Sequence, residues 1–156
     1  MSKIRLGVLG GGGDSLIGVL HRVASHMYDR YEIVGGVFNP DYEENIKFAK
    51  QIGVNTERVY TDFDAFIAEE SAKPEGDKIE VVSVLTPNFL HYPMAKKLLE
   101  NGFHVICEKP LSLNPQNMKL IKKIENKTKK KCSPILQLRL HPKIKILKKQ
   151  IKKNNN

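Results

Sequence analysis

The residues that could do chemistry lie in three short motifs, of which the most unusual is EKP at residues 108–110. The apolar run VIC at residues 105–107 precedes it, so an acid and a base, Glu108 and Lys109, follow what reads as a buried strand. Ionisable groups there are costly unless they are paired or used. A positioned lysine ammonium can stabilise negative charge that develops on a reacting oxygen. Taken alone, the tripeptide does not outweigh the simpler interpretation, an ion pair at the rim of a sheet.

The second motif is the run GGGG at residues 10–13, which follows an apolar run and precedes a helical pattern. Glycines at such a turn let backbone N–H groups approach a phosphate, and the N-terminus of the next helix favours an anion. The spacing departs from GxGxxG, because Ser15 stands at the third position counted from Gly10 and Gly12. Gly18 is available for close packing of the helix on the sheet. A simple tight turn is the alternative, but the flanking elements favour phosphate binding.

Polar residues also follow two other strand-like runs. Asn39 comes 21 residues after Gly18, at the station where dinucleotide folds carry an acid that binds the adenosine ribose. An amide can bind that ribose without repelling a 2′-phosphate, so the choice between NAD and NADP stays open. In the third motif, Thr86 and Asn88 offer donors and acceptors at the end of a strand. His91 could contact a ligand or simply belong to the next helix.

The elements that must position these residues alternate regularly along the chain. Strands are expected at 4–10, 32–39, 58–62, 78–86, 104–109 and 134–140. Helices are expected at 15–30, 41–53, 62–73, 91–102, 114–130 and from 141 into a fraying polar terminus. Apolar strands joined by amphipathic helices predict an α/β fold with a doubly wound, mostly parallel sheet. The carboxyl ends of its strands would gather the three motifs at one edge.

Composition supports an ordinary globular domain with a possible appendage, since the 156 residues are 40% hydrophobic and 28% charged. No apolar run approaches the roughly 18 residues of a membrane span. The first residues lack the pattern of a signal peptide, so a cytoplasmic location is expected. The cysteines, Cys107 and Cys132, are too few for a disulfide framework and lack zinc-ligand spacing, so no metal is expected. Cys107 is expected to be an inert thiol in the core.

The positive net charge of +9 is unevenly spread. From Lys119 onward, 14 basic residues face one acid, Glu125, which gives +13, whereas residues 1–118 hold 12 basic and 16 acidic residues, or −4. A basic end can bind nucleic acid or an acidic surface. No aromatic residues are interleaved with these lysines, which disfavours a base-stacking surface. A solvated helix face is therefore the preferred interpretation.

Three motifs follow one another in this order: the glycine turn with IGxxHR, then TPNxxH, then EKP. Together they resemble the N-terminal nucleotide-binding domain of the glucose–fructose oxidoreductase/inositol dehydrogenase family (Gfo/Idh/MocA). EKP is the most specific element, and the resemblance extends from Lys3 to about Lys149. Residues 135–149 are similar to members that oxidise the 3-hydroxyl of UDP-linked N-acetylglucosaminuronic acids. The stretch at 10–22 is more similar to a generic sugar-dehydrogenase branch.

The resemblance implies a role for each matching residue. Lys109 would be the catalytic residue, orienting or polarising the substrate hydroxyl beside the nicotinamide. The glycines and the helix start would bind the pyrophosphate, Asn39 the adenosine ribose, and Glu108 the nicotinamide ribose. The implied cofactor-binding set is Gly10, Gly12, Gly13, Leu16, Ile17, Asn39, Thr86, Asn88, His91, Glu108, Lys109, Gln137 and Arg139.

The resemblance also implies the domain organisation and the partners. Residues 1–133 would form the dinucleotide-binding Rossmann domain, and residues 134–156 a strand and basic helix that lead into the family's second α/β domain, which this sequence lacks. The implied ligands are NAD or NADP and a sugar or sugar-nucleotide substrate, with a possible homo-oligomer. Such a chain should bind dinucleotide better than it turns over substrate. A non-catalytic dinucleotide-binding or regulatory module with a basic docking tail is the alternative.

Overall fold

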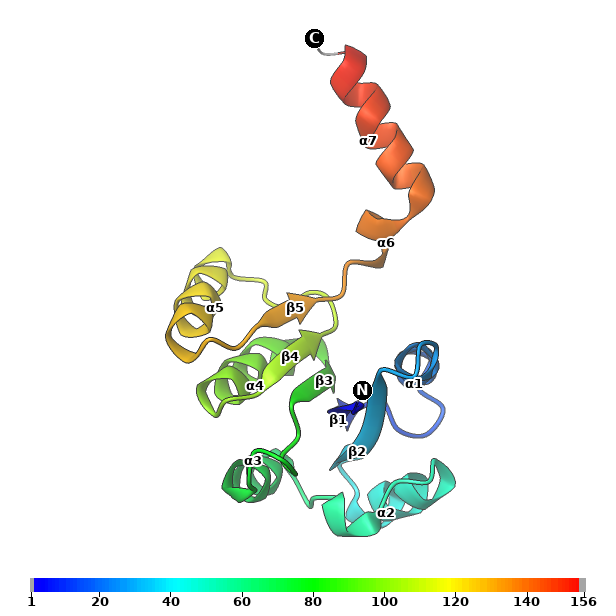
Figure 1. The fold of residues 1–156 in the computed structure, drawn as a ribbon, viewed down its shortest axis with the longest axis vertical. Helices are drawn as coiled ribbons and strands as arrows, with labels where there is room; N and C mark the ends of the chain where they lie inside the picture. Colours follow the sequence, from blue (N-terminus) through cyan, green and yellow to red (C-terminus); the bar gives the residue numbers. More distant parts are fainter. Residues whose placement is uncertain (1, 155–156) are drawn as a thin grey trace.

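The computed structural model describes residues 2–154, and Figure 1 shows their arrangement. The strands are β1 (Ile4–Gly10), β2 (Tyr31–Val37), β3 (Val81–Leu85), β4 (His104–Cys107) and β5 (Cys132–Pro134). The helices are α1 (Leu16–His26), α2 (Tyr42–Gln51), α3 (Phe63–Ala72), α4 (Asn88–Glu100), α5 (Pro115–Thr128), α6 (Gln137–Leu140) and α7 (Pro142–Asn154), with a 3₁₀ turn η1 (Thr56–Arg58).

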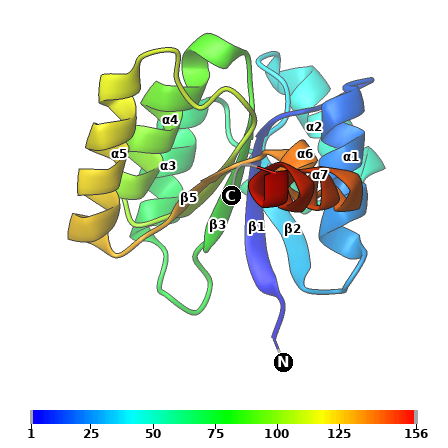
Figure 2. The ribbon, with the colours of Figure 1, turned by 90° about the horizontal axis from the view of Figure 1, so that it is seen from above.

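The five strands form one parallel sheet in the order β2-β1-β3-β4-β5. Figures 1 and 2 show α1 and α2 on one face of the sheet and α3, α4 and α5 on the other. The chain moves outward from β1 to β2 and then returns to the other side of β1 as β3. In open parallel sheets, ligands bind at the carboxyl ends of the strands where the order reverses in this way. The predicted α/β fold with a doubly wound sheet is confirmed.

Apolar packing is stronger on the face that α3, α4 and α5 cover. Phe66 of α3 and Phe103 before β4 are completely buried, with ring centroids 5.8 Å apart. A smaller cluster under α2 includes Phe38 and Phe48, whose ring centroids are 5.6 Å apart. In contrast, α1 exposes much of its apolar surface, because its buried residues are Gly18 and Ser25. The sheet is therefore held mainly from one side.

The helices that follow β1 and β2 begin at capping residues that the sequence shows clearly. Ser15 accepts a hydrogen bond from the Gly18 amide at 3.1 Å and so caps α1. Asp41 accepts from the Glu44 amide at 3.0 Å and caps α2. Such side chains satisfy amides that have no acceptor inside the helix. They fix where each helix starts relative to the carboxyl ends of the strands.

Two predicted strands were wrong. Residues 58–62 form only a single bridge between Gly36 and Val59, because the 3₁₀ turn η1 precedes it and Asp62 already caps α3. At 134–140 the strand ends at Pro134 and residues 137–140 are helical. There the alternation of leucines with Gln137 and Arg139 is typical of a strand. However, β4 ends at Cys107, so residues 137–140 have no neighbouring strand to pair with. Local hydrogen bonds then satisfy the backbone instead.

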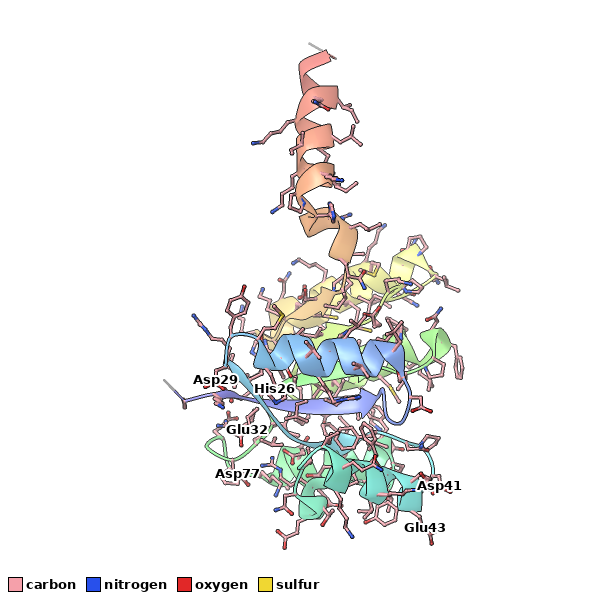
Figure 3. The ribbon with its side chains drawn as sticks, turned by 90° about the vertical axis from the view of Figure 1, so that its right-hand side faces the viewer. His26, Asp29, Glu32, Asp41, Glu43 and Asp77 are labelled. Carbon is pink, nitrogen blue, oxygen red and sulfur yellow. The ribbon has the colours of Figure 1, made fainter. Side chains whose placement is uncertain are left out.

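The end of the described chain lies outside the layered part of the molecule. Figures 1 and 3 show α7 standing away from the sheet, beyond β5 and α6. Its apolar residues Ile146, Leu147 and Ile151 are half exposed. Across residues 2–154, no helix combines the length and the apolar character needed to cross a bilayer. The proposed boundary between residues 133 and 134 remains a prediction.

Candidate functional site

The turn between β1 and α1 is shaped so that only glycine fits at several of its positions. Gly10, Gly11 and Gly13 have positive φ angles of 82°, 71° and 55°. A Cβ atom at Gly12 would lie 2.6 Å from the carbonyl oxygen of Phe38. At Gly18 it would lie 1.8 Å from the carbonyl oxygen of Gly11, so glycine alone lets α1 approach the turn this closely. The turn therefore brings backbone amides and the start of α1 together.

Two backbone donors at the start of α1 suit an anion. Leu16 and Ile17 are the first residues of the helix, so their N–H groups have no acceptor within it. Ser15 accepts a hydrogen bond from the next amide, that of Gly18. The amides of Leu16 and Ile17 therefore remain available to a ligand. The helix dipole adds partial positive charge at the same point. The cradle has the donors and the electrostatics that a diphosphate requires, which is the fit expected for a dinucleotide.

A cavity of about 540 Å³ opens beside this turn at the carboxyl ends of β1, β2 and β3, a size typical of small-molecule sites. Four of the residues predicted to bind cofactor line it together: Gly10, Gly12, Asn39 and Thr86. The complete lining is Leu9, Gly10, Gly11, Gly12, Val37, Phe38, Asn39, Pro40, Thr61, Asp62, Phe63, Leu85, Thr86, Pro87, Leu90 and Met94. We call this space the turn cavity. It is mostly apolar, with a few polar groups on its wall, as expected for an adenosine site.

The polar side chains of the turn cavity are held by neighbouring atoms. The Asn39 Oδ1 atom accepts a hydrogen bond from the Asp41 amide at 2.9 Å. This orients the Nδ2 group of Asn39 away from that amide. The Thr86 hydroxyl contacts the Met94 sulfur at 3.6 Å. Asn39 therefore presents a neutral donor at the station where a ribose is expected.

Glu108 lies on the opposite side of the turn, in a second cavity of about 390 Å³ between α1 and the sheet. Its lining also contains Ile17 and Gln137 from the predicted set, and comprises Leu6, Ile17, Leu20, His21, Ala24, Ser25, Tyr31, Ser83, Ile106, Glu108, Ile135 and Gln137. The structure therefore divides the predicted residues between two cavities. Gly13, Leu16, Asn88, His91, Lys109 and Arg139 line neither.

A hydrogen-bonded chain that the sequence analysis missed joins α1, β3 and β4. The Nε2 atom of His21 lies 3.1 Å from Oε1 of Glu108, and its Nδ1 atom lies 2.9 Å from the Ser83 hydroxyl. Ser83 and Glu108 are both buried. A neutral ring protonated at Nε2 satisfies both contacts, since the serine hydroxyl then donates to Nδ1. The signal was present in IGxxHR, which places His21 one helical turn after Ile17.

Lys109 is exposed at the end of β4. Its backbone N–H donates to Oε2 of Glu108 at 3.1 Å, so the buried carboxylate also fixes the backbone that carries the lysine. The peptide bond between Lys109 and Pro110 is cis. Within residues 2–154, the Lys109 ammonium forms no ion pair. It is therefore available to a ligand at this edge of the sheet.

His91 lies inside α4 and is only 1% exposed. Its Nδ1 atom lies 2.8 Å from the carbonyl oxygen of Pro110, and Nε2 lies 2.7 Å from that of Thr86. The ring thus links the turn after β3 to the turn after β4. Asn88 is the first residue of α4 and is exposed at the same edge.

The remaining predicted residues lie on α6. Gln137 and Arg139 are both exposed, and only Gln137 reaches the second cavity. Among the described residues, no three His, Cys, Asp or Glu side chains gather as metal ligands would. Burial raises the pKa of the Cys107 thiol to about 12, so this residue is a packed core side chain and not a nucleophile.

Comparison with known proteins gives a consistent result. The family model described as "Oxidoreductase family, NAD-binding Rossmann fold" (GFO_IDH_MocA) matches residues 4–135. The uncharacterized oxidoreductase YfiI of Bacillus subtilis is 38% identical over 125 residues, which cover 80% of this chain and 31% of that protein.

Two solved structures resemble this fold closely. An inositol dehydrogenase homolog from Azotobacter vinelandii, complexed with NADH and myo-inositol, has a TM-score of 0.81 at 33% identity over 85% of this chain and 35% of its own. The WlbA (WbpB) dehydrogenase from Thermus thermophilus, in complex with NAD and UDP-GlcNAcA, has a TM-score of 0.80 at 27% identity over 96% of this chain and 47% of its own. This chain thus spans less than half the length of each of these relatives.

The glycine cradle, the parallel sheet and these matches agree. The predicted family resemblance is confirmed, and a nicotinamide dinucleotide is the cofactor class of the family by its description. This chain belongs to the Gfo/Idh/MocA oxidoreductase family, and residues 4–135 are its NAD-binding Rossmann fold.

Proposed function

We propose that this chain is the cofactor-binding part of an NAD(P)-dependent dehydrogenase that acts on a hydroxyl-bearing carbon of a sugar or sugar-nucleotide. The observation that carries the proposal is the cradle of glycines and helix amides beside the turn cavity. The two structural relatives are in complex with myo-inositol and with UDP-GlcNAcA, which supports the polyhydroxylated class of substrate.

In this proposal the residues of the turn bind the cofactor's polar groups. The amides of Leu16 and Ile17 donate to the diphosphate, and the close contact at Gly12 keeps side chains out of its way. Asn39 donates to the adenosine ribose from the wall of the turn cavity, and Thr86 lines the same space. Gly10 and Gly13 supply the backbone geometry that other residues rarely adopt.

At the other end of the site, Lys109 is the proposed catalytic residue. A bound nicotinamide would supply the acceptor for the hydride that leaves the substrate carbon, and the hydroxyl proton would pass to solvent water. The ammonium of Lys109 stabilises the negative charge that develops on the substrate oxygen. Glu108 contributes at the nicotinamide side by fixing the Lys109 amide, and His91 fixes the turns on either side. The remaining residues proposed to contact the cofactor or substrate are exposed: Asn88, Gln137 and Arg139.

The proposal includes an organisation beyond the described fold. Residues 134–154 would connect the Rossmann domain to a substrate-binding domain, as the greater length of the relatives suggests. Assembly into a homo-oligomer and a cytoplasmic location are further parts of the proposal.

The experiment that tests this function is a titration of the purified chain with NADH and with NADPH, followed by nicotinamide fluorescence. We expect saturable binding of at least one of them. Gly12→Ala should weaken it at least about tenfold, because the new methyl group would collide with the Phe38 carbonyl. Gly76→Ala is the matched control, since a Cβ there meets nothing within 4 Å. Absence of saturable binding by both dinucleotides would contradict the proposal.

A further inference from the structure

A buried carboxylate at the carboxyl end of β4 is held from two sides. Glu108 is only 7% exposed. Its Oε1 atom lies 3.1 Å from Nε2 of His21, and its Oε2 atom accepts a hydrogen bond from the Lys109 amide at 3.1 Å. A buried carboxylate needs such donors, because an unpaired charge in the interior is costly. The orientation of Glu108 therefore depends on α1 at one oxygen and fixes the Lys109 backbone at the other.

The imidazole of His21 is itself fixed by β3. Its Nδ1 atom lies 2.9 Å from the hydroxyl of Ser83, a buried residue between Val82 and Val84, which are completely buried. When the hydroxyl donates to Nδ1, the ring proton must be on Nε2, the nitrogen that faces Glu108. Ser83 thus selects the tautomer that can donate to the carboxylate.

The side chains of His21, Ser83 and Glu108 line the second cavity together with Ile17. Ile17 lies in the first turn of α1, where the diphosphate is proposed to bind, and His21 follows four residues later on the same face of the helix. The cavity therefore extends from the diphosphate end of α1 to Glu108. One helix supplies both the amides for the diphosphate and the donor that holds the carboxylate.

The Glu108 carboxylate can still accept a hydrogen bond from a ligand. Its two oxygens provide about four acceptor positions, and the donors on His21 and Lys109 occupy one on each oxygen. A ribose hydroxyl can therefore donate to Glu108 without displacing either protein donor. Hydrogen bonds to charged groups are among the stronger ones, so the loss of such a contact should weaken binding about tenfold or more.

We propose that His21 is a positioning residue for the nicotinamide half of the site. With its tautomer fixed by Ser83, it orients the Glu108 carboxylate toward the nicotinamide ribose. Through Glu108 it also fixes the backbone of Lys109. The inference rests on the proposed function, because it assumes that the nicotinamide half lies at the carboxyl end of β4.

The test compares a dinucleotide with ADP as ligands of the whole chain. The dinucleotide is whichever of NADH and NADPH binds the natural chain more tightly by nicotinamide fluorescence, and the affinity for ADP is measured by its displacement. ADP lacks the nicotinamide and its ribose, so it reports on the other half of the site. We expect His21→Ala to weaken dinucleotide binding at least about tenfold and to change the affinity for ADP less than about twofold, because the substitution releases Glu108.

Two further variants separate positioning from packing. His21→Gln should restore most of the dinucleotide affinity, since its side-chain amide can donate to Glu108 in place of Nε2. Ser83→Ala removes a single hydroxyl and keeps the inference testable if His21→Ala fails to fold. It should weaken binding of the dinucleotide, but not of ADP, because the ring can then adopt either tautomer. The matched control is His26→Ala, which should leave both affinities unchanged, since His26 is exposed and ends α1 away from the glycine turn (Figure 3).

Equal weakening of dinucleotide and ADP binding by His21→Ala, or unchanged binding of both, would overturn the inference and leave His21 with a role in folding alone. A His21→Gln variant that binds the dinucleotide as weakly as His21→Ala would also overturn it. These outcomes leave the proposed function standing, because the natural chain still binds its dinucleotide. Failure of the natural chain to bind NADH and NADPH would overturn both.

Discussion

At the scale of single residues, Gly18 shows how a close contact can override a helix propensity. Alanine is normally about 1 kcal/mol better than glycine within a helix. Here its Cβ would lie 1.8 Å from the Gly11 carbonyl oxygen, so α1 would have to move away from the turn. We expect Gly18→Ala to lower the free energy of unfolding in urea and to weaken NADH binding. A variant as stable as the natural chain, with unchanged affinity, would show that the contact is not needed.

The hydrogen bonds that link Ser83, His21 and Glu108 give a second prediction at this scale. His21→Ala removes the side-chain donor of a buried carboxylate, which should cost about 1–3 kcal/mol of unfolding free energy. In a double-mutant cycle with Glu108→Gln, the two losses should be less than additive, because the second substitution removes the charge that the first leaves unpaired. His26→Ala, at an exposed position on the same helix, is the control. Strict additivity would mean that the two groups do not interact.

At the scale of elements, Glu70 holds α3 against the start of β3. Its completely buried carboxylate accepts hydrogen bonds from Arg58, from the Tyr60 hydroxyl and from the Ile79 amide, at 2.8 Å for Arg58 Nη2 and 2.9 Å for the amide. Burial, and then the Glu70 carboxylate, raise the pKa of Tyr60 well above its usual value of about 10. The folded protein therefore keeps the Tyr60 proton at a pH where the unfolded chain has lost it.

The sign of the pH dependence follows from this raised pKa. The contribution of Tyr60 to stability is complete below about pH 10, the pKa of an unfolded tyrosine, and declines as the pH rises further. Urea unfolding between about pH 9 and pH 11 should show a steeper loss of stability for the natural chain than for Tyr60→Phe. Tyr28→Phe, which alters a tyrosine that is 82% exposed, should behave as the natural chain does. Parallel curves for all three proteins would contradict the assignment.

The elements also show what the sequence could and could not predict. Apolar runs and helical patterns identified four of the five strands and the starts of α1 and α2. They could not show that β4 ends at Cys107, so the alternation at 134–140 predicts a strand although β4 offers it no further backbone partners there. Likewise, the contact between His21 and Glu108 joins residues 87 positions apart, so IGxxHR places His21 on α1 but does not show which residue it contacts. Asn39 and Thr86 came together in one cavity as the topology requires.

At the scale of the whole molecule, the layered fold and α7 should be separable. The stretch 141–156 contains six lysines and no acid, and α7 stands away from the sheet in Figure 1. A chain ending at Leu140 should therefore keep its thermal midpoint to within about 2 °C and its affinity for NADH. A drop in the midpoint of more than about 5 °C would mean that α7 stabilises the sheet. Loss of NADH binding alone would place the basic end in the site.

The proposed function requires that the diphosphate of a dinucleotide lies against the first turn of α1. A crystal structure of the chain with NADH tests this most directly. It should show diphosphate oxygens within hydrogen-bonding distance of the Leu16 and Ile17 amides, and the adenosine ribose beside Asn39. Bound NADH that leaves the glycine turn empty and lies elsewhere on the molecule would contradict the account.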